Sequence, residues 1–245
     1  MADGVPADFW KEAIDSLRQA AGNRRILMLA EGKRPDNFTA GFDMNYAWDF
    51  NEAMISVVRD AKPASLLFDV DKAEYDSLPA GKVKLRFTTN HDESTKKTPP
   101  ELFNSLRGSM AAYVAVTFLH GGALIYGSQE VGYPEPIYFF KYVPVDWTAN
   151  PEIYQEYQKL IGIYNASPAI REGVINSYPH KDVLAFDRTK GDNRILVLVN
   201  LRDSAVTIPT PKPWLTKETT DLCANKHVSL RDSVELQPYG YLILE

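Results

Sequence analysis

The hydrophobic pattern of this chain changes once, near Gly173, and the change divides the sequence into two kinds of structure. Before it, short apolar runs alternate with longer segments of helical period, which is typical of a parallel sheet whose strands are joined by helices. After it, short apolar runs follow one another between turn signals, at 183–186, 195–199, 206–208, 228–230, 234–236 and 241–244. The sequence therefore predicts an α/β domain followed by a small antiparallel β domain, a sandwich.

The first part of the chain is expected to hold four strands with helices between them. The run Arg25–Ala30 is almost wholly apolar, so we expect a strand that is buried on both faces of a parallel sheet. Thr98 and Glu101 have the spacing of a capping box before a long amphipathic helix. The predicted strands are 25–30, 41–46, 82–86 and 121–127, and the predicted helices are 6–21, 48–59, a short one before 78, 102–119 and one starting at 150–151.

Acidic and histidine side chains follow two of these predicted strands. Glu31 comes directly after residues 25–30, and Asn90, His91 and Asp92 come soon after residues 82–86. Because sites in parallel sheets and barrels are built where the strands end, we expect these side chains to lie together. Each alone has a structural explanation: a solvated loop acid, a hydrogen-bonded core histidine or a cap. Together they favour a functional site.

Charge and composition exclude several classes of protein and site. A net charge of −5 with no basic block argues against nucleic acid or an anionic membrane as a partner. The single cysteine, Cys223, excludes an internal disulfide and a site built from several cysteines. We predict no metal and no other cofactor. No apolar stretch has the length of a membrane span and the N-terminus does not resemble a signal peptide, so the localisation stays unknown.

The motifs in this order resemble the α-amylase family of glycoside hydrolases. Glu31 and the Asn90–Asp92 triplet follow strands as in that family, and 121–130 looks like its last barrel strand. Val145-Asp146-Trp147 and the closing segment 236–241 are similar to later parts of those enzymes. The resemblance covers essentially the whole chain. It implies that residues 1–172 are a half (β/α) barrel, strands five to eight, and that residues 173–245 are the family's C-terminal β-sandwich domain.

The resemblance also implies roles at the site. Glu31 matches the general acid and base, and Asp92 matches the carboxylate that holds sugar hydroxyls and stabilises the transition state. His91 and Asn90 are expected to contact the substrate. Tyr46 and Trp48 are candidates for stacking on sugar rings, although aromatic residues beside strands are more often part of the core. The implied substrate is an α-linked glucan.

The chain departs from the family pattern at its N-terminus. The family's nucleophilic aspartate lies in an Arg-x-Asp motif at the end of the fourth barrel strand, and Met1 stands where that motif should already have finished. Two function classes therefore stay open: a glycoside hydrolase acting on α-linked glucans, and an inactive remnant that only binds oligosaccharide. Without that nucleophile, Glu31 as acid and Asp92 as base would give inversion, which needs carboxyl groups about 6.5–9.5 Å apart.

A half barrel leaves apolar surface exposed, and this predicts association. In a closed barrel the inner face is filled by side chains from all eight strands, so four strands leave one face and two edges uncovered. Unpaired edges and large apolar patches promote contact with another chain. We therefore expect a homodimer that buries the open barrel face.

Overall fold

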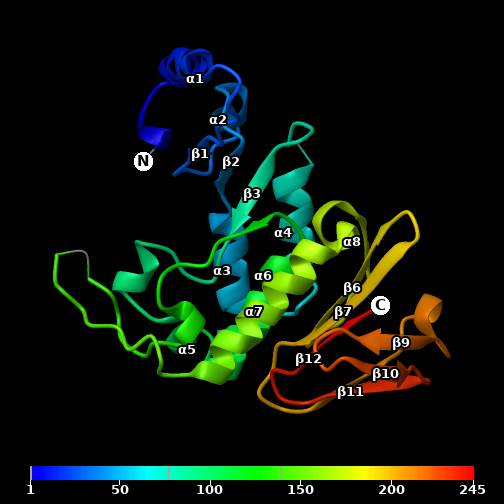
Figure 1. Ribbon diagram of the computed structural model, residues 1–245. Coiled ribbons are helices and arrows are strands. Elements are labelled where there is room, and N and C mark those ends of the chain that lie inside the picture. Colours follow the sequence, from blue (N-terminus) through cyan, green and yellow to red (C-terminus); the bar gives the residue numbers. More distant parts are fainter. Residues whose placement is uncertain (1, 77, 139) are drawn as a thin grey trace.

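The computed structural model describes residues 2–76, 78–138 and 140–245, and its first half is built on a four-stranded parallel sheet (Figure 1). The strands are β1 (Leu29–Ala30), β2 (Met44–Tyr46), β3 (Val83–Arg86) and β4 (Gly122–Ala123), and they lie side by side in chain order. Leu29 lies opposite Met44, Tyr46 opposite Leu85, and Leu85 opposite Gly122. The predicted partial (β/α) barrel is confirmed.

Helices lie between the strands as the sequence predicts. They are α1 (Ala7–Ala21), α2 (Asp36–Thr39), α3 (Trp48–Arg59), α4 (Leu66–Tyr75), α5 (Pro99–Leu102), α6 (Leu106–Leu119), α7 (Pro151–Ala166) and α8 (Pro168–Glu172), with 3₁₀ turns at Ala2–Gly4, Glu93–Thr95, Gln129–Val131 and Lys212–Trp214. The alternation along β3 separates the two faces of the sheet. Arg86 faces α3 and α4, where its guanidinium lies 3.5 Å from the ring centre of Phe50. Leu85 faces the open side with Tyr46 and Phe87.

The first strand differs from the prediction. It is short, and burial on both faces is wrong: Leu27 is 68% exposed and Leu29 is 40% exposed, whereas Ala30 is fully buried. The reason is topological, because β1 is an edge strand and its open face has no second layer in this structure. The predicted strand at 121–127 is likewise reduced to Gly122–Ala123 at the other edge.

The predicted long amphipathic helix is wrong in two respects. The capping box at Thr98 and Glu101 is present, but it begins only the short α5, and Asn104 then takes a left-handed backbone with φ of 66° before α6. All residues of α6 from Gly108 to Leu119 are buried, so this helix has no solvent face. It is enclosed because the C-terminal sheet packs on it, and the Arg188 guanidinium donates to the Leu119 carbonyl at 2.6 Å.

The C-terminal part is an antiparallel β domain of two sheets, as predicted. Its strands are β5 (Val174–Ser177), β6 (Val183–Lys190), β7 (Asn193–Asn200), β8 (Val206–Pro209), β9 (Glu218–Asp221), β10 (Lys226–Ser229), β11 (Ser233–Leu236) and β12 (Tyr241–Leu244). Six form one sheet in the order β10-β9-β12-β7-β6-β5, and β11 and β8 form the other. The sequence pattern missed β5 and β9, whose polar residues carry little apolar alternation.

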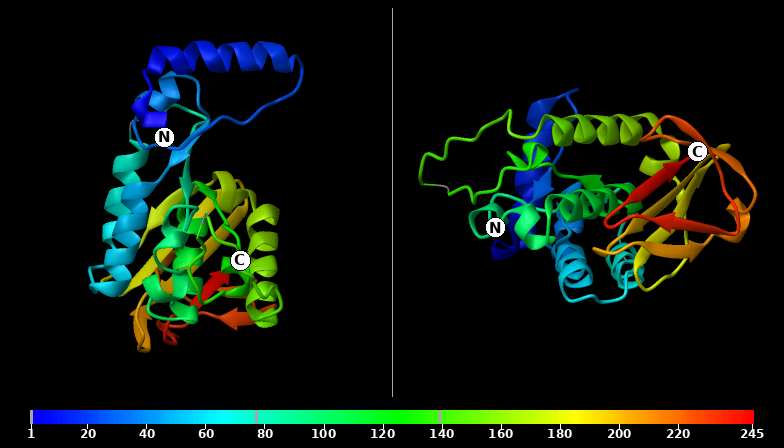
Figure 2. Two further views of the ribbon diagram at one scale, coloured as in Figure 1. Left: turned by 90° about the vertical axis from the view of Figure 1, so that its left-hand side faces the viewer. Right: turned by 90° about the horizontal axis from the view of Figure 1, so that it is seen from below.

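The six-stranded sheet is covered on both faces. Side chains such as Ala185 and Leu198 pack on the two-stranded sheet, whereas Phe186 and Val197 pack on the helices of the half barrel. Figure 2 shows this β domain at one end of the molecule and α1 at the other. One hydrophobic core therefore joins α3, α6, α7 and α8 to the C-terminal sheet. Within the described residues, no helix is long and apolar enough to span a membrane.

Replacing each of two helical glycines by alanine should change the free energy of unfolding in opposite directions. In Gly108→Ala the new Cβ would lie 1.9 Å from the Phe103 carbonyl oxygen, so the backbone must shift, and we expect a loss of about 1–3 kcal/mol in the free energy of unfolding. In Gly162→Ala, on exposed surface of α7, nothing lies within 4 Å, and better helix propensity should add about 1 kcal/mol. Urea denaturation measures both, and equal effects of the same sign would contradict this packing.

Candidate functional site

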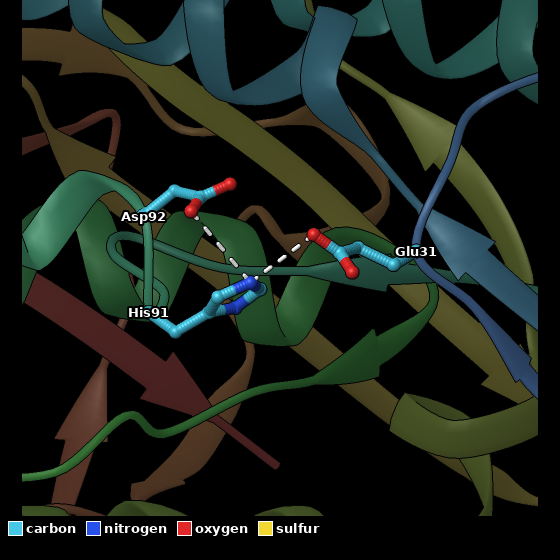
Figure 3. Close-up of side chains that lie close together, drawn as sticks. All are labelled: Glu31, His91 and Asp92. Atoms are coloured by element: carbon cyan, nitrogen blue, oxygen red, sulfur yellow. Dashed lines mark hydrogen bonds and ion pairs between the residues drawn. The ribbon is translucent and has the colours of Figure 1, made fainter. Parts of the chain in front are cut away.

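Glu31, His91 and Asp92 come together at the carboxyl ends of β1 and β3, where the sequence places them (Figure 3). His91 Nε2 lies 3.1 Å from Glu31 Oε1 and 3.7 Å from Asp92 Oδ1. The side chains of the three residues are 33–40% exposed, so a solvent-borne molecule can reach them. The imidazole thus stands between two carboxylates from segments 60 residues apart in the sequence.

The position of Glu31 is fixed by the N-terminal turn, a contribution that the sequence did not predict. The backbone N–H of Ala2 donates to the Glu31 carbonyl oxygen at 2.8 Å. Asp3 accepts hydrogen bonds from the backbone N–H of Lys33 at 2.9 Å and from the Asn37 side chain at 3.0 Å. Burial alone would raise the pKa of Asp3, but these hydrogen bonds lower it overall. A single acid in a short turn gives no pattern that would reveal this role.

Gly32, next to Glu31, has no room for a side chain. A Cβ there would lie 2.1 Å from Asp3 Oδ1. The turn at Ala2–Gly4 therefore packs against the backbone beside Glu31. This contact needs glycine for space rather than for an unusual backbone angle.

Asn90 lies beneath the site and not on its surface. It is fully buried, and its Oδ1 accepts from the backbone N–H groups of Asp92 at 3.0 Å and of Glu93 at 2.9 Å. In this structure its side chain has no surface on which a sugar could bind. Instead of the predicted contact with substrate, Asn90 positions the backbone of its own loop. Asparagine commonly bonds to backbone groups two residues ahead in this way. The loop that carries His91 and Asp92 is held by this turn.

We expect Asn90→Ala to loosen that loop. The substitution removes the acceptor of two buried backbone hydrogen bonds, each worth about 0.5–1.5 kcal/mol, so the free energy of unfolding should fall by about 1–3 kcal/mol. Asn90→Ser keeps an oxygen that can accept one of them and should lose less. Urea denaturation compares the two variants, and an equal loss in both would show that the side-chain oxygen is not the cause.

Aromatic rings form the wall beside the three polar side chains. Tyr46 and Trp48 stack with ring centres 5.7 Å apart, and Tyr46 meets His91 edge to face at 6.4 Å. Phe87 lies against both rings of the wall. Tyr46 is only 7% exposed, whereas Trp48 is half-buried. Of the two predicted stacking residues, Trp48 is therefore the more accessible.

The two carboxylates of the site also affect the pKa of Tyr46. Burial raises the pKa of its phenol, and the negative charges of Glu31 and Asp92 raise it further. The hydroxyl therefore stays protonated at neutral pH and can donate a hydrogen bond. A donor beside two carboxylates is suited to holding a polar, hydroxyl-rich molecule.

The spacing of the site limits its chemistry. One ligand atom from each of Glu31, His91 and Asp92 lies within 4.8 Å of the others, a set that could also accept a metal ion, although the sequence predicted none. The same spacing bears on the inverting mechanism, which needs carboxyl groups about 6.5–9.5 Å apart to admit a water between them and the sugar. One oxygen of each carboxylate lies within 4.8 Å of the other, and inversion by this pair stays a prediction.

Comparison with known proteins gives one family match and many similar folds. Residues 175–243 match the family described as Maltogenic Amylase, C-terminal domain. No curated protein matches the sequence at a significant level. The fold is similar to a noncanonic maltogenic alpha-amylase from Thermotoga neapolitana, with a TM-score of 0.80 and 20% identity over 98% of this chain and 58% of that one.

Two further solved structures agree with this likeness. An alpha-amylase from Lactobacillus plantarum has a TM-score of 0.83 at 17% identity, over 98% of this chain and 60% of that one. A cyclic alpha-maltosyl-(1-->6)-maltose hydrolase from Arthrobacter globiformis has a TM-score of 0.76 at 20% identity, over 98% of this chain and 53% of that one. The chain thus spans less than two thirds of the length of each of these three structures.

Proposed function

We propose that this chain, which has the partial-barrel fold of α-amylases and a C-terminal domain of the maltogenic amylase family, acts as a glycoside hydrolase on α-linked glucans. The proposal rests on one observation: Glu31, His91 and Asp92 converge at the carboxyl ends of the strands. In this proposal residues 1–172 carry the site. Residues 173–245 brace it through the shared core.

Each side chain has a role that its position permits. Glu31 donates a proton to the departing glycosidic oxygen and later takes one from water. Asp92 binds sugar hydroxyls and stabilises positive charge that develops on the ring. His91, within 3.1 Å of Glu31, orients that carboxyl group and donates to the sugar. Tyr46 donates from the wall, and the half-buried Trp48 offers its ring for stacking.

The role of Glu31 as both acid and base implies a retaining reaction in two steps. A carboxylate other than Glu31 and Asp92 attacks the anomeric carbon as the glycosidic bond breaks, and water then displaces it from the covalent intermediate. Proton NMR of the first product released from a maltooligosaccharide tests this step. We expect the α-anomer first, and a β-anomer would restore inversion.

Release of reducing sugar from soluble starch by the purified chain tests the function itself. We expect release above a buffer control and none from cellulose, whose linkages are β. A second candidate, binding of oligosaccharide without hydrolysis, is favoured by one observation: in the described part of the chain, the acid and histidine cluster holds only two carboxylates, and both have roles other than attack. Binding with no sugar released would select it.

We also propose that a second copy of the chain covers the open barrel face. Apolar side chains there and on α1 are unusually exposed, at 68% for Leu27, 40% for Leu29, 58% for Phe9 and 51% for Leu17. Burying roughly 1,000 Å² of apolar surface at about 25 cal/mol/Å² gains ~25 kcal/mol gross, which exceeds an association cost of about 4–15 kcal/mol.

Sedimentation equilibrium at micromolar concentration measures this association. We expect a dimer for the wild type and a monomer for the double variant Leu27→Glu, Leu29→Glu. Leu215→Glu is the matched control, since Leu215 is also 40% exposed but lies in the C-terminal domain. A monomeric wild type, or loss of the dimer in the control alone, would contradict the proposed face.

A further inference from the structure

A cavity of about 550 Å³ lies on the side of the sheet opposite the aromatic wall. Its lining comes from the loop after β1, from α2, α3 and α4, from the segment after α4, and from β3: Lys33, Arg34, Pro35, Phe38, Asp49, Asp69, Val70, Ala73, Glu74, Leu78 and Lys84. Lys84 alternates along β3 with Leu85, so it faces away from Tyr46 and Phe87. The cavity is therefore separate from the Glu31 site.

Lys84 is the unusual group in this lining. It is only 5% exposed, and its Nζ donates to Asn45 Oδ1 at 2.7 Å. Lys33, by contrast, is exposed and pairs with Asp49 at 2.7 Å. The partner of Lys84 is a neutral amide, and an ammonium has three N–H donors. A buried lysine held by a neutral acceptor at a cavity wall has the position of a nucleophile rather than of a structural ion pair.

The surroundings favour the neutral amine. Burial lowers the pKa of Lys84, and the Arg86 charge lowers it further, against the opposing charges of Glu74 and Asp49. Each unit by which a lysine pKa falls raises the neutral fraction about tenfold at neutral pH. Lys84 thus offers more free amine than it would in water.

We propose that Lys84 is a carbonyl-reactive amine and that this cavity takes a small aldehyde with an apolar body. The amine nitrogen attacks the carbonyl carbon, a C–N bond forms, and the carbonyl oxygen leaves as water with the two amine protons. The product is an imine, and no oxidant or reductant is needed. Desolvated lysines form such Schiff bases.

The rest of the lining selects the body of the aldehyde. Pro35, Phe38, Val70 and Leu78 supply apolar contact, and pockets of this size are typical of small-molecule sites. Lys33 is already paired with Asp49, and Arg34 pairs with Asp36. The two cations at the loop are therefore balanced and do not favour an anionic aldehyde over a neutral one.

Reductive labelling of the full chain tests the proposal. The protein is treated with benzaldehyde and sodium cyanoborohydride for increasing times, and each modified lysine is located by peptide mass spectrometry. We expect Lys84 to be modified faster than exposed lysines such as Lys217, because its lowered pKa leaves more of it as free amine. Modification of Lys84 at or below the rate of the exposed lysines would overturn the proposal.

Two variants and one control separate reactivity from access. Lys84→Arg keeps the charge but cannot form an imine, and we expect it to lose the fast phase. The control Lys82→Arg, just before β3, should keep it. Ala73→Leu places a larger side chain at an exposed position of the cavity wall and leaves Lys84 in place. It should slow the labelling of Lys84 by at least about tenfold. An unchanged rate in Ala73→Leu would show that the aldehyde does not enter through this cavity.

Discussion

Replacing Glu31 by glutamine is expected to slow glucan hydrolysis by about 10²–10⁴-fold, the usual contribution of a general acid and base. The amide keeps the size of the side chain and can still hydrogen-bond His91, but it cannot carry the proton to the glycosidic oxygen. Binding of the glucan should change little, so the loss should fall on kcat. Initial rates of reducing-sugar release over a range of glucan concentrations separate kcat from KM.

The control for this prediction is Glu52→Gln, which removes an exposed carboxylate on α3 outside the site. We expect its rate to equal that of the wild type. Equal rates for Glu31→Gln and the wild type would remove Glu31 from the mechanism. If neither the wild type nor Glu31→Gln released sugar, the binding-only alternative would remain.

Arg86→Met is expected to lower the free energy of unfolding by about 3–5 kcal/mol, because it leaves buried acids without their cation. The Arg86 side chain is 1% exposed, and its Nη2 lies 2.7 Å from Asp71 Oδ1 and 2.9 Å from Glu74 Oε2. Both acids are largely buried, at 12% and 6% side-chain exposure. Methionine keeps much of the apolar volume against Phe50, so the loss reports mainly on charge.

Two comparisons check that cause by urea denaturation. The triple variant Asp71→Asn, Glu74→Gln, Arg86→Met removes all three charges of this cluster together and should recover much of the loss. Arg18→Met breaks a more exposed pair with Asp43, whose side chains are 39% and 28% exposed, and should cost less than about 1 kcal/mol. A loss in Arg18→Met as large as in Arg86→Met would show that burial of the pair does not decide the effect.

Much of the fold follows from local sequence pattern. The helix at 48–59 was predicted to the residue, because apolar spacing and flanking residues agree there. Glu31, His91 and Asp92 could be expected to meet because they follow strands of one parallel sheet, whose carboxyl ends share an edge. The order and direction of the strands were therefore enough to predict that these three residues meet.

The errors share a physical cause, which is packing between distant segments. Leu27 and Leu29 look like core residues, but their exposure depends on which layer covers the sheet. The burial of α6 on all sides depends on the C-terminal sheet, more than 60 residues along the chain. Asn90 was expected to contact the substrate because the triplet resembles that of the α-amylase family, and only the fold shows that it bonds to its own loop.

Isothermal titration of the purified chain with maltohexaose is the most direct test of the proposed glucan site. We expect saturable binding that is lost or reduced at least about tenfold in Asp92→Ala and kept in the surface control Asp15→Ala, with no binding of the β-linked cellohexaose. Absence of maltohexaose binding, or equal binding by Asp92→Ala, would contradict a glucan site at Glu31, His91 and Asp92.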